Sequence, residues 1–537
     1  MLSILLEIAT AVGSATSSSG VSAALSFVQA HYILVSLSVI VLALWFFVFR
    51  DTAVLPPPTF NFVPGLIKGD FNMKEEGPMG LIRAGYKAKG DCYRLRLGHR
   101  HVTMMIGPEA SQVAYEARDT ELNQAEVYGF TVPVFGKGVV YDSPARQIVQ
   151  QFKFVSKGLS GDAMRSHSAK ILQETELFFK SWPQEGTICL KKALSELTCL
   201  TASRCLLGRE IRESVHVRFA ELYEHLNDGM TAISFVWPEA PTKAHRLRNK
   251  ARIEISKIFK PIIAARRASN NANDDDDFLQ VLIDSRYRLV LVSVCVGLMA
   301  CRAFRDGTAL TDEEIIGLLL AALFAGQHTS SITSTWTGLN IFSKKKDLVY
   351  VSVFGLLALP KLLAEQKTVM DKHGGEITMD SLADMELLHN CMKETLRLYP
   401  PLILLLRKVK VDSLRYRDFV IPKGDIICAA PPVSMRLEEV WEHPNEFDPE
   451  RFLRDEVCNK DRKYAFQAFG GGRHACLGER FAFLQIKTIW SLLLRTFDFE
   501  LMGAFPKPDY DTTVVGPKVP CMVKFRRKTD PYSMSDL

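Results

Sequence analysis

The residues best suited to chemistry lie in the loop from Phe469 to Gly478, which reads FGGGRHACLG. Its glycines allow backbone N–H groups to approach the sulfur of Cys476 closely. A helical sequence follows the loop, and the positive end of a helix stabilises a thiolate. These features suit a cysteinate ligand to a large, flat metal centre. The loop alone leaves open a tight glycine turn with an incidental buried cysteine.

Charged residues upstream could hold this loop in place. Glu394 and Arg397 stand three residues apart in ETLR, so a helix carries them on one face. Arg451, in PERF, lies shortly before the loop and could complete an Arg–Glu–Arg cluster. The alternative is an ordinary surface pair, which contributes little to stability.

A third motif, AGQHTS at residues 325–330, interrupts an apolar helix expected over residues 315–336. A glycine followed by polar residues costs stability in a buried helix, which indicates a local opening where something binds. The alternative is a satisfied core histidine, with serine and threonine hydroxyls bonded back to the helix.

The elements that must position these motifs are mostly helical. The pattern predicts strands at 93–96 and 101–106, a helical body over about 107–399, and further strands between 402 and 428. A helix follows at about 478–495, with closing strands near Phe499 and Val523. The expected fold class is mainly α with small β-sheets, in one large compact domain.

The composition excludes several classes of protein but does not distinguish one kind of enzyme from another. The chain has 537 residues, a net charge of +6 and 11 cysteines without a CxxC pair. This composition excludes disordered, collagen-like and disulfide-stapled proteins. The odd cysteine count indicates a reducing compartment.

The N-terminal end is typical of a membrane anchor. No Asp, Glu, Lys or Arg occurs from Ile8 to Phe49, and residues 32–49 are apolar except for two serines, long enough to span a bilayer. A signal peptide is the alternative, but the run is long and far from the terminus. Positive charges follow the run, so the rest of the chain is expected in the cytoplasm. We expect an anchor at 1–50, a Pro-rich linker at 51–60 and one domain at 61–537.

Together, the three motifs resemble those of the membrane-bound cytochromes P-450, and within them the sterol 14α-demethylases. That family pattern is Phe-x-x-Gly-x-Arg-x-Cys-x-Gly, with Glu-x-x-Arg upstream and an oxygen-activating helix that bears an acid before Thr. Here His474 replaces the Arg and His328 replaces the acid, and both changes are typical of the sterol demethylases. Further matching stretches are 128–142, 197–208 and 433–437, and the likeness runs from about Pro56 to the C-terminus.

The resemblance implies a cytochrome P-450 fold with an N-terminal transmembrane helix and a haem b whose axial ligand is the Cys476 thiolate. The implied haem-contacting residues are Tyr128, Tyr141, Arg407, His474, Phe469 and Gly470. The implied substrate wall is Phe130, Phe135, Ala322, Phe324 and Ala325. Thr329 and His328 are the implied catalytic residues that feed protons to bound oxygen, with Asp228 as a candidate acid.

The implied reaction is three successive monooxygenations that remove the sterol 14α-methyl group as formate. Each uses dioxygen and two electrons from NADPH through a separate flavoprotein reductase. The implied location is the endoplasmic reticulum membrane, single-pass, with the catalytic domain on the cytoplasmic side and no nucleic-acid partner. Basic residues near the thiolate loop are either a reductase-docking face or ordinary solvated charges: Lys460, Arg462, Lys463, Arg480 and Lys487.

The sequence departs from the family pattern in two polar contacts. Asn227-Asp228 stands where the family has an acid paired with the active-site histidine, so either Asp228 substitutes after a small shift or the proton relay is altered. Gln150-Gln151-Phe152 stands where a basic residue for a haem carboxylate is common. Phe130 matches members that act on sterols with one C4-methyl group, such as obtusifoliol rather than lanosterol.

Two apolar runs, at about 288–305 and 342–359, are extra to the family pattern and suggest translated introns or lineage-specific insertions. The first is expected in a surface loop, where insertion is tolerable; the second, if exposed, would favour aggregation. Two other functions stay open. One is a different lipid-hydroxylating cytochrome P-450 of the same membrane; the other is a haem-binding protein that the insertions have inactivated.

Overall fold

The computed structural model describes residues 55–61, 76–97, 100–214, 216–235, 237–269, 277–288, 307–343, 358–454 and 463–531. The expected anchor and most of both extra runs lie outside these residues. The chain divides into two compact units, 1–57 with 415–421 and 58–414 with 422–537. In the smaller unit, Leu55 is bridged to Phe419 of β8 (Phe419–Ile421). The larger unit carries all the motifs.

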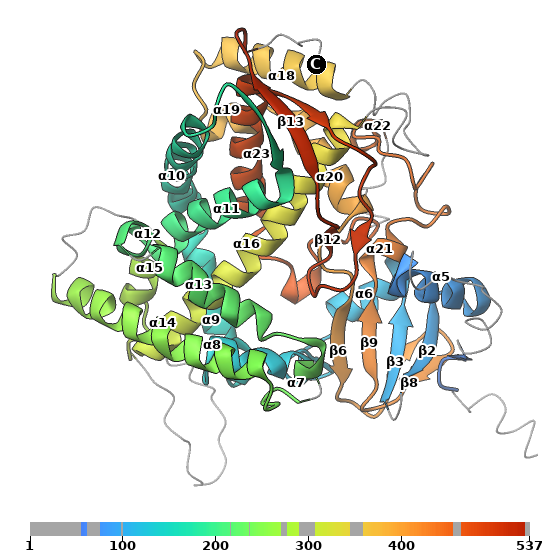
Figure 1. The fold of residues 1–537 in the computed structure, drawn as a ribbon. Coiled ribbons are helices and arrows are strands. Elements are labelled where there is room, and N and C mark those ends of the chain that lie inside the picture. Colours follow the sequence, from blue (N-terminus) through green and yellow to red (C-terminus); the bar gives the residue numbers. More distant parts are fainter. Residues whose placement is uncertain are drawn as a thin grey trace, which may run out of the picture. The chain divides into compact units, whose positions relative to one another are not determined.

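Helices dominate the larger unit, which confirms the expected mainly α class (Figure 1). The longer helices are α5 (Pro78–Lys89), α6 (Pro108–Glu116), α9 (Ala145–Gly158), α10 (Gly161–Lys180), α11 (Leu190–Ala202), α13 (His216–Asp228), α14 (Lys243–Ala268), α16 (Asp312–Phe342), α18 (Ala358–Lys372), α20 (Glu386–Leu398) and α23 (Glu479–Thr496). The short ones are α7 (Ala125–Tyr128), η1 (Gly129–Thr131), α8 (Val132–Phe135), η2 (Val140–Asp142), η3 (Ser203–Leu207), α12 (Arg209–Ser214), η4 (Ala232–Phe235), α15 (Phe278–Asp284), α19 (Met379–Ala383), α21 (Pro431–Ser434), α22 (Arg451–Arg454) and η7 (Gly472–His474).

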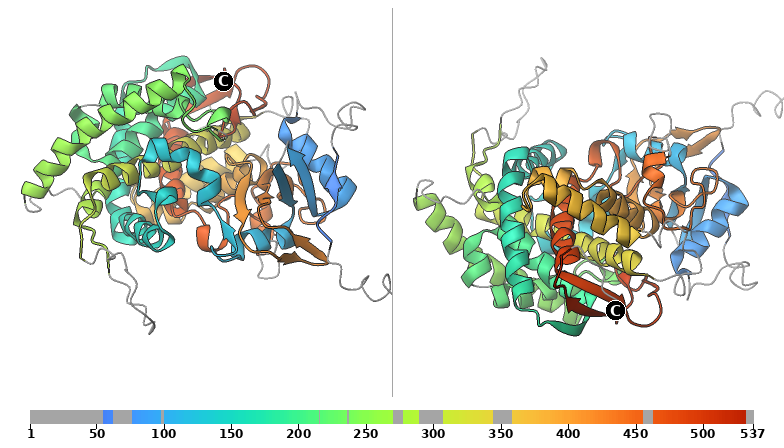
Figure 2. Two further views of the ribbon diagram at one scale, coloured as in Figure 1. Left: turned by 90° about the horizontal axis from the view of Figure 1, so that it is seen from below. Right: turned by 90° about the horizontal axis from the view of Figure 1, so that it is seen from above.

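The strands form small sheets, as expected. The largest has the order β1-β2-β3-β9-β6-β4. Its strands are β1 (Thr59–Phe60), β2 (Cys92–Leu97), β3 (Arg100–Met105), β4 (Leu122–Asn123), β6 (Leu405–Val409) and β9 (Ile426–Ala429). In both views of Figure 2, the blue helix α5 lies beside the strands of this sheet, and the green helices gather on the other side.

A second sheet closes the helical part, with β13 (Met522–Arg527) between β10 (Phe497–Leu501) and β5 (Glu185–Cys189). Strand β5 falls inside the segment that was expected to be helical. The reason is a non-local pairing, because β5 lies antiparallel to β13 with Ile188 opposite Val523. Local sequence pattern does not reveal such a partner.

Helix α16 is the central element of the larger unit. It packs against α11, α20 and α23 (Figure 1). Thr311 and Glu314 form a capping box at its N-terminus, which satisfies two of the free backbone N–H groups there. Among the described residues it is the one helix long and apolar enough to cross a membrane, but it is mostly buried in the protein. It is therefore a core helix.

The start of α16 is tied to α9 and to the chain before the first extra run. Gln147 of α9 and Tyr287 both donate to Glu314 Oε1, at 2.9 and 3.1 Å. Tyr287 N also donates to Thr308 O at 3.0 Å, and Gly307 N donates to Tyr287 O at 2.8 Å. The two ends of the first run are therefore held side by side. The second run leaves from the last residue of α16 and ends where α18 begins.

The structure brings together the three charges Glu394, Arg397 and Arg451. Arg397 donates to both carboxylate oxygens of Glu394 at 2.8 Å, and Arg451 Nε donates to Glu394 Oε1 at 3.0 Å. All three side chains are at most 2% exposed. Arg397 also donates to Met435 O at 2.9 Å, and Arg451 to Glu442 O at 2.7 Å. The cluster thus ties α20 to the chain that leads to the thiolate loop.

Removal of Glu394 should strongly destabilise the fold. Glu394→Ala leaves two buried guanidinium groups without a carboxylate, which costs about 3–5 kcal/mol in comparable buried pairs. Chemical denaturation of the purified protein measures the loss. The matched control is Lys372→Ala, which removes an exposed pair with Asp384 and should cost less than about 1 kcal/mol. Equal losses in the two variants would contradict the role of the cluster.

Candidate active site

The thiolate loop presents Cys476 just before α23 begins. Cys476 N donates to Phe469 O at 2.9 Å, which closes the loop. The backbone N–H groups of Gly478 and Glu479 donate to the sulfur. Desolvation raises the pKa of the Cys476 thiol, and these two N–H groups act in the opposite direction. The side chain is nevertheless exposed, so a ligand can reach the sulfur.

Two glycines let this loop lie against α6. Gly472 has φ +64°, and a Cβ atom there would lie 2.0 Å from the backbone oxygen of Tyr115. A Cβ atom at Gly471 would lie 2.4 Å from the ring of Tyr464. Neither position accepts a side chain without movement of its neighbours. The glycines of the motif therefore serve close packing as well as access to the sulfur.

A polar cluster lies beside the loop. His474 Nε2 lies 2.6 Å from Asp119 Oδ1. In the amide orientation that satisfies both neighbours, Gln124 donates to His474 Nδ1 at 3.2 Å and accepts from Arg407 Nη2 at 3.1 Å. Gln124 thus joins two of the residues expected to contact a haem carboxylate. Burial lowers the pKa of Arg407, whose side chain is buried.

Two tyrosines complete this cluster. The rings of Tyr128 and Tyr141 stack with centroids 5.2 Å apart. Tyr128 Oη accepts a hydrogen bond from Leu406 N at 3.2 Å, which fixes it next to Arg407 in β6. The structure therefore gathers Tyr128, Tyr141, Arg407 and His474 from four separate segments.

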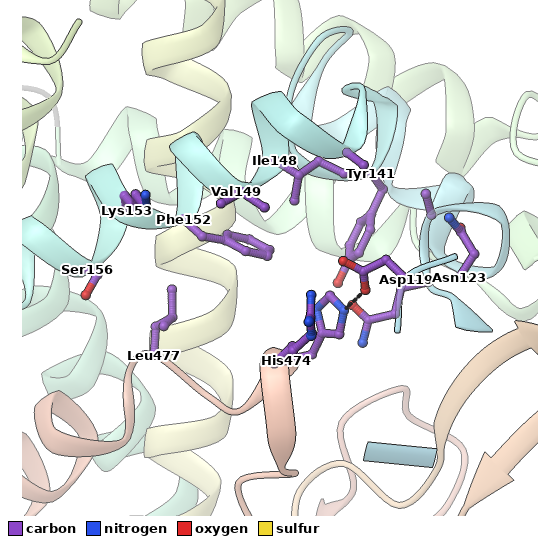
Figure 3. Close-up of a pocket in the computed structure, with 14 residues that line it drawn as sticks. Asp119, Asn123, Tyr141, Ile148, Val149, Phe152, Lys153, Ser156, His474 and Leu477 are labelled. Carbon is purple, nitrogen blue, oxygen red and sulfur yellow. Dashed lines mark hydrogen bonds and ion pairs between the residues drawn. The ribbon is translucent and has the colours of Figure 1, made fainter. Parts of the chain in front are cut away.

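A cavity of about 420 Å³ opens between α9 and the thiolate loop. Figure 3 shows Phe152 of α9 above Leu477 and His474 of the loop, with Asp119 and Tyr141 next to His474. Lys153 of α9 also lines it. The cavity thus combines an apolar floor with cationic groups at its rim.

Sequence reasoning missed Lys153, Asp119 and Gln124. In the segment that departs from the family pattern, Gln151 is buried. Its side chain accepts a hydrogen bond from Val140 N and donates one to Gly138 O, both at 2.8 Å. Lys153 follows two residues later and reaches the cavity instead. Helical spacing in the sequence could have predicted this position of Lys153, because Val149, Phe152 and Lys153 lie on one face of α9.

One stripe of α16 is open although most of the helix is buried. Ala325 is exposed, and Ala321, Ala322 and Thr329 are partly exposed. These positions recur at helical spacing, so they face one side. A Cβ atom at Gly326 would meet only Leu206, at 4.0 Å. Thr329 Oγ1 donates to Ala325 O at 2.5 Å, so the threonine is satisfied within the helix.

The expected substrate wall divides into two aromatic contacts. Phe135 of α8 lies edge-on to Phe324 of α16, with centroids 5.8 Å apart. Phe130 of η1 is buried and packs on Phe235 of η4 at 4.0 Å. Phe235, which the sequence analysis did not select, thus extends the wall. Ala322 is partly exposed and Ala325 exposed on α16, the helix that carries Phe324.

The structure does not bring Asp228 to His328. Asp228 is exposed at the end of α13. Instead, His328 stacks on Tyr223 with centroids 5.8 Å apart and 15° between the rings. Burial lowers the pKa of His328 to about 4. The imidazole is therefore neutral at physiological pH.

The expected docking residues differ in their surroundings. Lys487 is 7% exposed, and burial lowers its pKa to about 8, so it is unsuitable for a docking face. Lys463 bonds Glu116 Oε1 at 2.7 Å, whereas Arg480 is exposed. Lys460 and Arg462 lie outside the described residues.

Comparisons with known proteins agree with this geometry. The family model for cytochrome P450 matches residues 56–525. The obtusifoliol 14-alpha demethylase of Triticum aestivum is 40% identical over 88% of this chain and 98% of its own length. The sterol 14-demethylase of Arabidopsis thaliana is 40% identical over 88% and 91%, and the lanosterol 14-alpha demethylase of Bos taurus 37% over 84% of each.

A solved structure shares the fold. The retinoic acid bound cyanobacterial CYP120A1 superposes with a TM-score of 0.70, at 20% identity, over 88% of this chain and 99% of its own. The match confirms the expected fold of the larger unit. With Cys476 in its glycine-rich loop at the start of α23, and with these relatives, the chain belongs to the cytochrome P450 family, in the branch that holds the sterol 14α-demethylases.

Proposed function

We propose that this protein removes the 14α-methyl group of a sterol as formate, in three monooxygenation steps that each consume dioxygen and NADPH-derived electrons. The observation that carries the proposal is the exposed Cys476 in a fold and sequence shared with the sterol demethylases. The proposed electron donor is an NADPH-dependent flavoprotein reductase.

The residues near Cys476 fit a haem. Haem with a thiolate ligand supplies activation of dioxygen and cleavage of the O–O bond. Cys476 offers an accessible sulfur with two backbone donors, and Gly478 leaves 3.8 Å between a would-be Cβ atom and that sulfur. Phe469 and Gly470 lie at the other side of the closed loop. The open stripe of α16 supplies a flat, small-residue surface suited to a planar ring.

The polar cluster fits the two carboxylates of a haem. Arg407 and His474 would hold one of these groups, with the hydroxyls of Tyr128 and Tyr141 as donors. Lys153, at the rim of the cavity, is the cation that stands in for the missing basic residue at 150–152. Charge-assisted bonds of this kind fix the orientation of a bound carboxylate.

The proposed sterol site lies along the open stripe of α16. Phe130, Phe135 and Phe324 provide apolar surface for a rigid ring system, and Ala322 and Ala325 leave room for it. Thr329 and His328 stand on the same helix, one turn beyond. Their proposed role is to hold and deliver protons at the reacting centre.

The proposed setting is the endoplasmic reticulum membrane. Residues 1–50 would form a single-pass anchor, residues 51–60 a stiff linker and residues 61–537 the haem-thiolate monooxygenase domain on the cytoplasmic side. The exposed cations Arg473 and Arg480 near the loop suit an acidic reductase.

Replacement of Cys476 should abolish the thiolate-haem spectrum. In Cys476→Ala the iron loses its sulfur ligand, so the reduced carbon monoxide complex lacks the thiolate-type absorbance band. The control Cys189→Ala removes a partly exposed thiol in β5 and should retain the band. A band that persists in Cys476→Ala, or that folded wild-type protein lacks, refutes the assignment.

Phe130 should select sterols with one C4-methyl group. One extra methyl group in a tight apolar pocket changes kcat/KM by about tenfold or more, so the wild type should process obtusifoliol faster than lanosterol. Phe130→Leu makes room and should narrow that ratio, whereas Phe178→Leu, in an aromatic cluster with Phe179 and Trp182, should leave it unchanged. Competitive turnover of the two sterols decides; faster conversion of lanosterol by the wild type would refute this selection.

The two extra runs, about 288–305 and 342–359, are proposed to be retained introns or insertions of this lineage. If they are introns, the mature transcript should join the codons that flank each run. Sequencing of that transcript is the measurement, and a transcript that encodes both runs excludes the intron origin and leaves true insertions.

A further inference from the structure

His328 lies in an aromatic cage. Its ring is parallel to that of Tyr223 of α13 within 15°, at 5.8 Å between centroids, and meets Phe324 at 6.0 Å and 61°. Tyr223 also packs on Phe324 at 4.8 Å. Separations and angles of this kind are favourable for ring contacts. The imidazole is therefore fixed by two rings, one from its own helix and one from α13.

The polar atoms of this cage are buried without partners. Tyr223 is 4% exposed, and neither its Oη atom nor His328 Nε2 has a hydrogen-bond partner among the described residues. Unsatisfied buried polar atoms are costly, and a catalytic role is one of the reasons that a fold retains them. The unpaired Nε2 of His328 therefore points to a role for the imidazole beyond packing, and the ring of Tyr223 is the neighbour that holds it.

The electrostatics of the cage are those of neutral groups. Burial is the one cause that lowers the pKa of His328, and no charged group within the described residues adds to it. Burial also raises the pKa of Tyr223 well above its ordinary value, with a smaller contribution from Cys199 of α11. Both side chains therefore remain uncharged across the physiological range.

The helical register of α13 explains why an aromatic ring reaches His328 and the acid does not. Phe219, Leu222, Tyr223 and Leu226 are buried on one face of the helix. Asp228 falls on the opposite, exposed side. A side chain cannot cross from one face of a helix to the other without a shift in register.

We propose that Tyr223 is the positioning residue for His328, and that its ring holds the imidazole as a neutral group next to Thr329, so that proton delivery in this protein needs no carboxylate partner. The inference rests on the proposed monooxygenase function. It identifies α13, through Tyr223, as the second element that controls the reactive part of α16.

Two substitutions at one position test the role of the ring. Tyr223→Leu removes the stack, whereas Tyr223→Phe preserves it. In the reconstituted holoenzyme with reductase, product formed per NADPH consumed should fall about tenfold in Tyr223→Leu. This is less than the roughly 10²–10⁴-fold effect of losing a proton-transfer group outright, because His328 itself remains. Tyr223→Phe should stay within about twofold of the wild type. Phe219→Leu is the matched control, because it removes a buried ring on the same face of α13 that packs on Tyr223 and Phe259 and, among the described residues, makes no ring contact with His328.

The pH profile separates positioning from loss of stability. The smaller leucine leaves room for water beside the imidazole, so the pKa of His328 should rise from about 4 toward its ordinary value near 6.5. In Tyr223→Leu the imidazole then becomes charged as the pH falls from about 7.5 to 5.5, and the yield per NADPH should fall with it. The wild type and Phe219→Leu should show no such step above pH 5, because their His328 has a pKa of about 4 and stays neutral.

Each result bears on the inference. An unchanged yield of product per NADPH in Tyr223→Leu would overturn it. So would an equal loss of yield in Phe219→Leu, or a larger loss of yield in Asp228→Asn than in Tyr223→Leu. If the wild type shows the thiolate-haem band but converts neither sterol, the proposed function has failed. The Tyr223 role is then decided by NADPH oxidation and hydrogen peroxide release, whose pH dependence should still differ between Tyr223→Leu and Tyr223→Phe.

Discussion

The active-site loop depends on one buried electrostatic interaction, the pairing of Glu394 with Arg397 and Arg451. The two guanidinium groups use their remaining donors on backbone oxygens, including Met435 O and Glu442 O. Met435 Sδ in turn accepts from Gln467 N at 3.2 Å, and Gln467 O accepts from Gly470 N at 3.0 Å. A continuous path of hydrogen bonds thus runs from one buried carboxylate to the turn that presents Cys476. A fixed sulfur position follows from it.

Helix α16 must satisfy two opposing demands. It is buried on most sides as a core element, yet one stripe, which includes Ala325 and Thr329, remains open. Hydroxyls resolve part of this conflict, because Thr333, Thr335 and Thr337 donate to carbonyl oxygens one turn earlier. The same back-bonding occupies Thr329, so the polar motif fits a continuous helix. The local opening expected from Gly326 is an opening of the surface and not a break in the helix.

The parts that sequence predicted well are short-range. The geometry at the glycines around Cys476 and at the Glu394–Arg397 pair is determined by residues that are close in the sequence. The observed bounds of β2, β3 and α23 lie within two residues of the expected ones. Contacts between distant segments were beyond such reasoning. The stack of Tyr223 on His328, the burial of Lys487 and the pairing of β5 each depend on packing partners far away in the chain. The expected contact between Asp228 and His328 does not form for a different reason. Successive residues of a helix lie on different faces, and Asp228 lies on the exposed face of α13.

The paired backbone at Tyr287 and Gly307 has a consequence for how this gene can change. The two residues close a neck, and on its described side Tyr287 is joined to the core through Glu314 and Gln147 of α9. Codons added or lost beyond the neck alter the length of a closed loop, whose entropic cost grows only slowly. Changes of length at this position should therefore cost the fold little stability. Neutral drift can accumulate there while the reactive centre stays unchanged.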